Sequence, residues 1–166
     1  LRTFQQTRIY SKMDCVDNMQ ISVSHRQDSK SSIFASRKGE VRDRAEHLLE
    51  FVGLYSKRSL ISGDLSFGQQ KLLEFAMALM NEPKVLLLDE PTAGINPTLI
   101  NGLIDRLRRA NEELGITLCV IEHNMRVIMN LASHIYCLSN GKMLADGKPE
   151  TLQNDPRVID AYLGGH

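Results

Sequence analysis

Paired cysteines, net charge and long apolar runs are all scarce in this sequence. Its three cysteines lack any C-x-x-C spacing, and Cys119 and Cys137 lie in apolar, strand-like runs, so we expect buried, reduced thiols there. The 20 Lys and Arg residues balance 20 Asp and Glu residues, which argues against long-range attraction to nucleic acid or anionic lipid. No apolar run reaches the roughly 18–20 residues of a membrane-spanning helix, and no signal peptide is visible. Any membrane contact is therefore expected to come through a partner.

The glycine-rich phosphate loop, G-x-x-x-x-G-K-[ST], also occurs nowhere in the 166 residues. Because the first residue is Leu1 rather than methionine, we expect the chain to begin part-way through a longer product. Its length and its 42% apolar content fit one domain with a sizeable core.

Hydrophobic spacing predicts helices first and an α/β alternation later. Residues 1–64 are polar and weakly periodic, with an exposed loop expected over 22–39 and helical spacing over 41–52. From Leu65 onward helices and strands alternate, which predicts an α/β fold with a largely parallel sheet. The expected elements are a helix opening at Ser66 and running to Leu79, a strand buried on both faces at 85–88, a helix over 98–114, a buried strand at 116–121, a helix over 124–131, a hairpin around Ser139-Asn140-Gly141 and two short C-terminal helices broken by Asp155-Pro156.

The most informative polar cluster stands at the first of these helix starts. Ser66 and Gln69 have the S-x-x-Q form of a capping box. A helix N-terminus offers free N–H groups and a partial positive charge, so it attracts phosphate, and Gly68 would let an anion approach the backbone. Alone, this pattern is equally that of an ordinary cap without a ligand.

Acidic residues and a histidine follow the predicted strands. Asp89 and Glu90 come where an apolar strand meets a loop, the edge at which open α/β sheets bind ligands. Asp89 is placed to hold Mg²⁺ and Glu90 to act as general base on an attacking water. His123 follows the next strand, where a neutral imidazole can contact a terminal phosphate. Gln5, in Arg2-Thr3-Phe4-Gln5, carries an amide within reach of metal or water.

Together and in this order, these segments resemble the ATPase domain of ATP-binding cassette (ABC) transporters. Leu65-Ser66-Phe67-Gly68-Gln69 resembles the family signature, and Val85 to Glu90 resembles the Walker B strand with its catalytic glutamate. Asn96 then falls in the D-loop, His123 matches the switch histidine and Gln5 the Q-loop glutamine. Phe67 stands in place of a signature glycine and Asn96 in place of the common D-loop aspartate.

The particular residues within these motifs resemble those of the branched-chain amino-acid importer ATPases. Urea-importer and lipopolysaccharide-exporter ATPases are the alternatives. This resemblance implies a single partial ABC ATPase domain over 1–166, with a P-loop NTPase-like sheet that is incomplete. Within it we expect an inserted helical subdomain over 6–80, core strands over 81–140, and a hairpin strand with C-terminal helices over 141–166.

The resemblance also implies cofactors and partners. ATP and Mg²⁺ are expected, with Glu90 and His123 catalytic, Asp89 and Gln5 at the metal, and Gln5, Ser66, Phe67, Gly68, Gln69 and Asn96 at the nucleotide. A second ABC ATPase, identical or related, and integral-membrane permease subunits are the expected partners, at the cytoplasmic face of the inner (plasma) membrane and without nucleic acid. Without the phosphate loop, the 166 residues alone are expected to be inactive.

Two other readings stay open at this point. The chain fits a non-catalytic, degenerate half that pairs with an intact ATPase, although Glu90 and His123 speak against it. Chromosome-maintenance ATPases share the motif order, but the long heptad repeats and the basic charge typical of that class do not occur.

Overall fold

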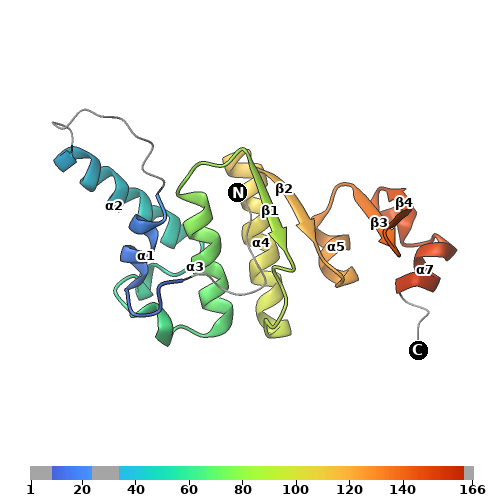
Figure 1. The fold of residues 1–166 in the computed structure, drawn as a ribbon, viewed down its shortest axis with the longest axis horizontal. Helices are drawn as coiled ribbons and strands as arrows, with labels where there is room; N and C mark the ends of the chain where they lie inside the picture. The colour runs from blue at the N-terminus through green and yellow to red at the C-terminus, as the bar shows by residue number, and fades with distance from the viewer. Residues whose placement is uncertain (1–8, 24–33, 163–166) are drawn as a thin grey trace. The chain divides into compact units, whose positions relative to one another are not determined.

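Two units make up the computed structural model, which describes residues 9–23 and 34–162 (Figure 1). The first unit ends at Ile121 and the second begins at Glu122. Among the described residues, none of the helices combines the length and apolar character that crossing a bilayer requires.

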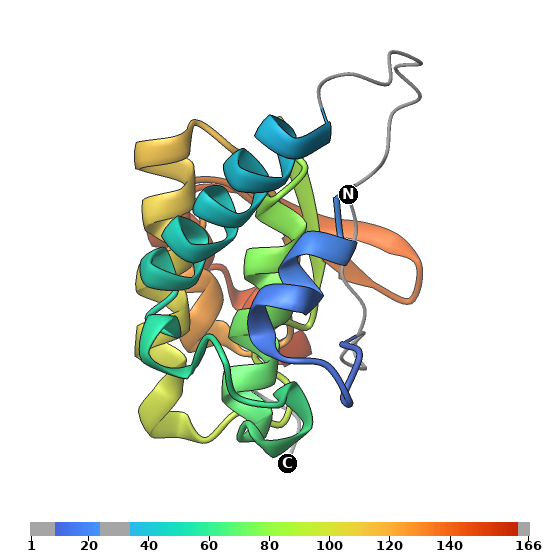
Figure 2. The ribbon, with the colours of Figure 1, turned by 90° about the vertical axis from the view of Figure 1, so that its left-hand side faces the viewer.

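Three helices pack side by side at the start of the first unit: α1 (Cys15–Ile21), α2 (Phe34–Phe51) and α3 (Phe67–Leu79) (Figure 2). Short 3-10 helices at Tyr55–Lys57 and Ser62–Asp64 connect α2 to α3. The expected helix over 41–52 is confirmed by α2, which stops just before Gly53 at φ +79°. However, α2 begins at Phe34, so the expectation of a loop as far as residue 39 was wrong. The buried side chains shared by these helices include Cys15, Met19, Ala45, Leu48, Leu49, Val52, Leu73 and Ala76.

A parallel strand pair and a long helix complete the first unit. Strand β1 (Val85–Asp89) pairs with β2 (Thr117–Ile121), Asp89 lying opposite Ile121, and α4 (Pro97–Leu114) packs against β2. Arg106 ties α4 to α2, because its Nε donates a 2.6 Å hydrogen bond to the carbonyl of Val52. These elements confirm the predicted strand–helix–strand order.

One face of the strand pair is less covered than the sequence suggests. Leu86 and Leu88 are 0% and 3% exposed, whereas Val85 and Leu87 are 46% and 42% exposed. Since successive strand side chains point to opposite faces, one face of β1 is packed and the other is half-open. Helices α3 and α4 lie on the packed face, since Phe75 of α3 and Leu103 and Leu107 of α4 line the same small cavity as Leu88. The expectation that both strands are buried on both faces was therefore wrong, and Cys119 in β2, expected to be buried, is exposed.

The second unit contains a short helix, a hairpin and two C-terminal helices. Helix α5 (Met125–Leu131) precedes the antiparallel strands β3 (Ile135–Ser139) and β4 (Lys142–Gly147), which are followed by α6 (Pro149–Leu152) and α7 (Pro156–Tyr162). Asn140 and Gly141 have φ values of +49° and +74°, the conformation of a type I′ hairpin turn, so the hairpin prediction is confirmed. Ile135, Cys137, Ala145, Leu152 and Val158 form the core of this unit, with Met125 and Met129 packed against it.

The α/β fold class is thus confirmed, in the form of one parallel strand pair and one antiparallel hairpin. Strand β4 and helices α6 and α7 fall within the expected range 141–166, and strand β3 lies just before it. The finer division into 6–80, 81–140 and 141–166 stays a prediction.

Candidate functional site

The N-terminus of α3 carries the predicted capping box. The Gln69 backbone N–H donates to the Ser66 hydroxyl oxygen at 3.4 Å, and the Ser66 N–H donates to the Gln69 side-chain oxygen at 3.1 Å. Leu65, 4% exposed, anchors the preceding residue in the core, while Ser66 itself is exposed. The hydroxyl therefore serves the helix as an acceptor and keeps its own hydrogen for donation to an anion.

The first turn of α3 lies against the segment that follows β1. A Cβ built on Gly68 would lie 3.2 Å from a Leu99 methyl carbon, and one built on Gly94 would lie 3.0 Å from Cε1 of Phe67. The structure thus brings the signature-like turn and residues 94–99 together. Gly68 has a packing reason to be glycine as well as the anion-binding reason inferred from the sequence.

Asp89 and Glu90 stand at the carboxyl end of β1. The Glu90 N–H donates to the Ile121 carbonyl at 2.8 Å, and Glu90 has a φ of +46°. Non-glycine residues with positive φ are uncommon and are concentrated at turns and functional sites. The turn continues with hydrogen bonds from the Ala93 N–H to the Glu90 carbonyl and from the Ile95 N–H to the Thr92 carbonyl, both 3.1 Å. The backbone that carries the glutamate is therefore held from both sides.

Asn96 has a structural partner in place. Its side-chain oxygen accepts from the Thr98 N–H at 3.0 Å and from the Thr98 hydroxyl at 2.9 Å, and Pro97 occupies the first helical position of α4. This arrangement confirms the predicted cap-plus-proline start of the helix. The contact of Asn96 with a nucleotide stays a prediction.

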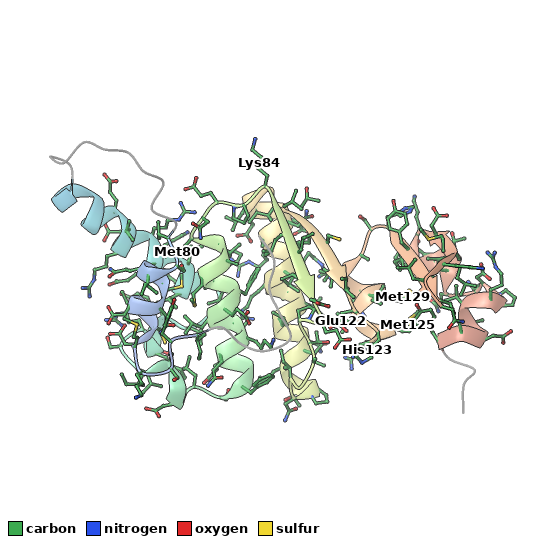
Figure 3. The ribbon with its side chains drawn as sticks, in the orientation of Figure 1. Met80, Lys84, Glu122, His123, Met125 and Met129 are labelled. Atoms are coloured by element: carbon green, nitrogen blue, oxygen red, sulfur yellow. The ribbon has the colours of Figure 1, made fainter. Side chains whose placement is uncertain are left out.

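His123 belongs to the second unit, where it is exposed just before α5 (Figure 3). Asn124 caps that helix by accepting from the Val127 N–H at 3.4 Å, and the Asn124 N–H donates to Glu122 at 3.4 Å. The imidazole therefore sits on a capped, well-defined helix start. Gln5 lies outside the described residues.

A metal-binding cluster of three or more His, Cys, Asp or Glu side chains does not occur within residues 9–23 and 34–162. Asp89 supplies one hard carboxylate at a strand end. That donor set fits Mg²⁺, which commonly takes one or two carboxylates from a protein and the remaining oxygens from phosphate and water.

A buried ion pair beneath the site was not found by sequence reasoning. Lys71 and Glu74 on α3 are 6% and 8% exposed, and Lys71 Nζ lies 3.8 Å from a carboxylate oxygen of Glu74. Both residues line a cavity of about 20 Å³ together with Pro91. The only sequence signal is the i, i+3 spacing of opposite charges on an otherwise apolar helix face.

Comparison with solved structures defines the class of the fold. The ADP conformation of MJ1267, an ATP-binding cassette of an ABC transporter, aligns with a TM-score of 0.81 and 30% identity over 99% of this chain and 68% of that one. A nucleotide-free ATP-binding cassette from an ABC transporter aligns with a TM-score of 0.76 and 29% identity. The fold is that of an ATP-binding cassette.

Sequence comparison extends this result to the family. The ABC transporter family model matches residues 2–93, and the model for the branched-chain amino acid ATP-binding cassette transporter matches residues 142–166. The high-affinity branched-chain amino acid transport ATP-binding proteins BraF of Pseudomonas aeruginosa and LivG of Escherichia coli are 35% and 34% identical, each over 99% of this chain. The chain belongs to the ABC transporter ATP-binding proteins, in the branched-chain amino acid transport group. It spans 67% of the length of BraF and of LivG.

Proposed function

We propose that this chain forms part of the ATP-hydrolysing subunit of a transporter that imports branched-chain amino acids. The cargo is proposed from BraF and LivG, whose names state branched-chain amino acid transport. The observation that carries the reaction is the turn at Glu90, which holds a carboxylate at the end of a parallel strand and continues to Gly94 and Ile95 next to the capped start of α3.

Each polar residue has a role in this proposal. Glu90 accepts a proton from the water that attacks the terminal phosphate, and Asp89 is the ligand for Mg²⁺, which supplies charge neutralisation when bound. His123 and Gln5 orient the phosphate and the water. At the start of α3, Ser66, Gly68 and Gln69 present N–H and hydroxyl donors to phosphate, with Asn96 nearby in sequence on the turn after β1.

The proposal extends to partners by family resemblance. Two ATP-binding subunits enclose the nucleotide, so that the signature-like turn of one faces the phosphate loop of the other. Permease subunits couple this closure to transport at the cytoplasmic face of the plasma membrane. In such a pair, Ser66 to Gln69 act on the nucleotide that the second subunit holds.

The alternative is a non-catalytic half that only completes the site of an intact ATPase. The observation that favours it is that G-x-x-x-x-G-K-[ST] occurs nowhere in the 166 residues. Glu90 and His123 favour the catalytic function, because a subunit that merely supplies a signature need not keep them.

A glutamate substitution separates the two. We expect the 166 residues alone to show no ATP turnover, and the same chain extended upstream by a phosphate-loop segment to hydrolyse ATP when paired with its permease. In that extended protein, Glu90→Gln is expected to lower turnover about 100-fold or more, because the general base is lost. Glu112→Gln, an exposed carboxylate on α4, is the matched control. Full activity of the Glu90→Gln protein would contradict the catalytic proposal, and turnover by the 166 residues alone would contradict the need for a phosphate loop.

A further inference from the structure

We propose that Phe67 is a positioning residue. Its ring packs against Gly94 and thereby holds the signature-like turn and Glu90 in a fixed position relative to each other within one subunit. The inference rests on the proposed function, since it assigns a mechanical link to residues of that same site. The sequence places Phe67 at the nucleotide, and within the chain its ring lies against Gly94 and Lys71.

The contact between Phe67 and Gly94 is close. Gly94 has a φ of +73°, and a Cβ built there would lie 3.0 Å from Cε1 and 3.6 Å from both Cδ1 and Cζ of Phe67. The ring thus occupies the space in which any other side chain at residue 94 would begin. Both the positive φ and the closeness of the ring favour glycine at this position.

A second contact lies one residue further along α3. A Cβ on Gly68 would lie 3.2 Å from Leu99 and 3.8 Å from Ile95. Ile95 is itself buried, with 8% exposure, so the first turn of α3 rests on a packed part of the turn after β1. Two successive signature residues therefore touch the same segment.

The Phe67 ring also lies near the buried ion pair of Lys71 and Glu74. Lys71 Nζ lies 5.7 Å from the centroid of the Phe67 ring, within the range of a cation–π interaction. Lys71 is also paired with Glu74, and both residues line a cavity of about 20 Å³ together with Pro91. A cavity of that size holds about one water molecule.

Two backbone hydrogen bonds connect the segment around Gly94 to Glu90. The carbonyl of Glu90 accepts from the Ala93 N–H, and the carbonyl of Thr92 accepts from the Ile95 N–H. Gly94 lies between these bonds, so a shift at Gly94 must open one of them or move Glu90. In the proposed pair of subunits, the signature serves one nucleotide and Glu90 serves the other, and Phe67 links the two.

Amide hydrogen exchange tests the link without nucleotide. In Phe67→Ala, we expect the Ala93 and Ile95 amides to exchange about three- to tenfold faster, the effect of losing one aromatic contact on a local opening equilibrium. Phe67→Leu, which keeps an apolar side chain over Gly94, is expected to restore most of the protection. Tyr55→Ala is the matched control, because Tyr55 is also half-exposed, at 41%, beneath a cation, Arg58. Unchanged exchange in Phe67→Ala, or equal acceleration throughout α3, would overturn the proposal.

Glycine substitutions give an independent test of the Phe67–Gly94 contact. Gly94→Ala and Gly115→Ala both place alanine at positive φ, but a Cβ at Gly115 meets nothing within 4 Å. We expect Gly94→Ala to lower the denaturation midpoint more than Gly115→Ala, and Phe67→Ala to remove that excess in the double variant. An excess that persists without the ring would contradict a Phe67–Gly94 contact.

Turnover separates this inference from the proposed function. In the protein extended by a phosphate-loop segment, Phe67→Ala is expected to lower kcat with little change in KM for ATP, because the catalytic turn and not the binding surface is disturbed. A rise in KM for ATP in Phe67→Ala with kcat unchanged would overturn the positioning role. If the exchange results hold but Glu90→Gln leaves turnover intact, the proposed function fails while the Phe67–Gly94 contact stands.

Discussion

Asn18 shows how one buried polar side chain orders an irregular segment. It is 0% exposed, and its oxygen accepts from the Tyr10 N–H at 2.7 Å. Its amide nitrogen lies 2.9–3.3 Å from the carbonyl oxygens of Tyr10, Met13 and Asp14 and from the Ser62 hydroxyl. The amide thus ties residues 10–14 to the 3-10 helix that precedes α3.

Asn18→Ala should therefore be costly. Because the substitution removes every side-chain hydrogen bond of a fully buried amide, including the one that the Tyr10 N–H donates, we expect a loss of about 2–3 kcal/mol in the free energy of unfolding. Asn154→Ala, which removes an exposed amide that bonds only the Glu150 carbonyl, is the control and should be nearly neutral. Denaturant unfolding of the two variants gives the comparison, and equal midpoints would show that the Asn18 network contributes nothing.

The three cysteines should differ in reactivity. Cys119 is exposed, Cys15 is 0% exposed and Cys137 is 6% exposed. Burial, and secondarily the charge of Asp14, raises the pKa of the Cys15 thiol from 9.0 to about 11. At neutral to mildly basic pH we therefore expect iodoacetamide to modify Cys119 first, read by mass spectrometry of the intact chain, and rapid labelling of Cys15 in the folded protein would contradict its burial.

The same thiol makes stability depend on pH. Because the folded pKa of Cys15 is the higher one, its contribution is complete below pH 9.0 and is lost as the pH rises toward about 11. Cys15→Ser, which does not titrate in this window, should flatten that part of the denaturation midpoint plotted against pH. An unchanged slope in the variant would assign the loss to other groups.

At the scale of elements, the cap of α3 has a structural function that is separable from ligand binding. Removing the Ser66 hydroxyl in Ser66→Ala should cost about 1 kcal/mol of stability, whereas Ser66→Gly should cost only about a few tenths, because glycine is a tolerated N-cap. Thermal unfolding of the two variants measures the difference. If alanine and glycine are equally damaging, the capping box does not stabilise the helix.

The elements that were predictable are those with strong local signals. The capping box at Ser66, the Asn96-Pro97 start of α4 and the Asn140-Gly141 turn are each set by the conformational preferences of their own residues, so the sequence alone locates them. Helix α1 was not predicted, since only seven residues form it and the buried amide of Asn18 interrupts its apolar pattern.

What failed was the prediction of burial, because burial depends on distant segments. An uninterrupted apolar run such as Val85–Leu88 is typical of a strand covered on both faces, yet Val85 and Leu87 are half-exposed here. The contact between Phe67 and Gly94 was invisible for the same reason. The sequence around Phe67 and around Gly94 predicts only local structure, and the two residues meet because α3 packs on the turn after β1.

At the scale of the whole molecule, the signature-like turn is expected to act across a pair of subunits. This chain spans two thirds of the length of its relatives BraF and LivG and carries a signature-like turn whose hydroxyl remains available for donation. If two ATP-binding subunits enclose the nucleotide, that turn acts on ATP held by the other subunit. The Ser66→Gly substitution isolates this function, because it removes the hydroxyl while largely keeping the cap.

The most direct measurement is ATP turnover by a second ATP-binding subunit that carries a phosphate loop, assayed with permease and with either this chain or its Ser66→Gly variant. We expect that the chain supports turnover and that the variant lowers it by about 100-fold, the effect of removing one donor to developing charge. Turnover at the same rate with the variant, at matched thermal stability, would show that the α3 N-terminus does not act on the nucleotide.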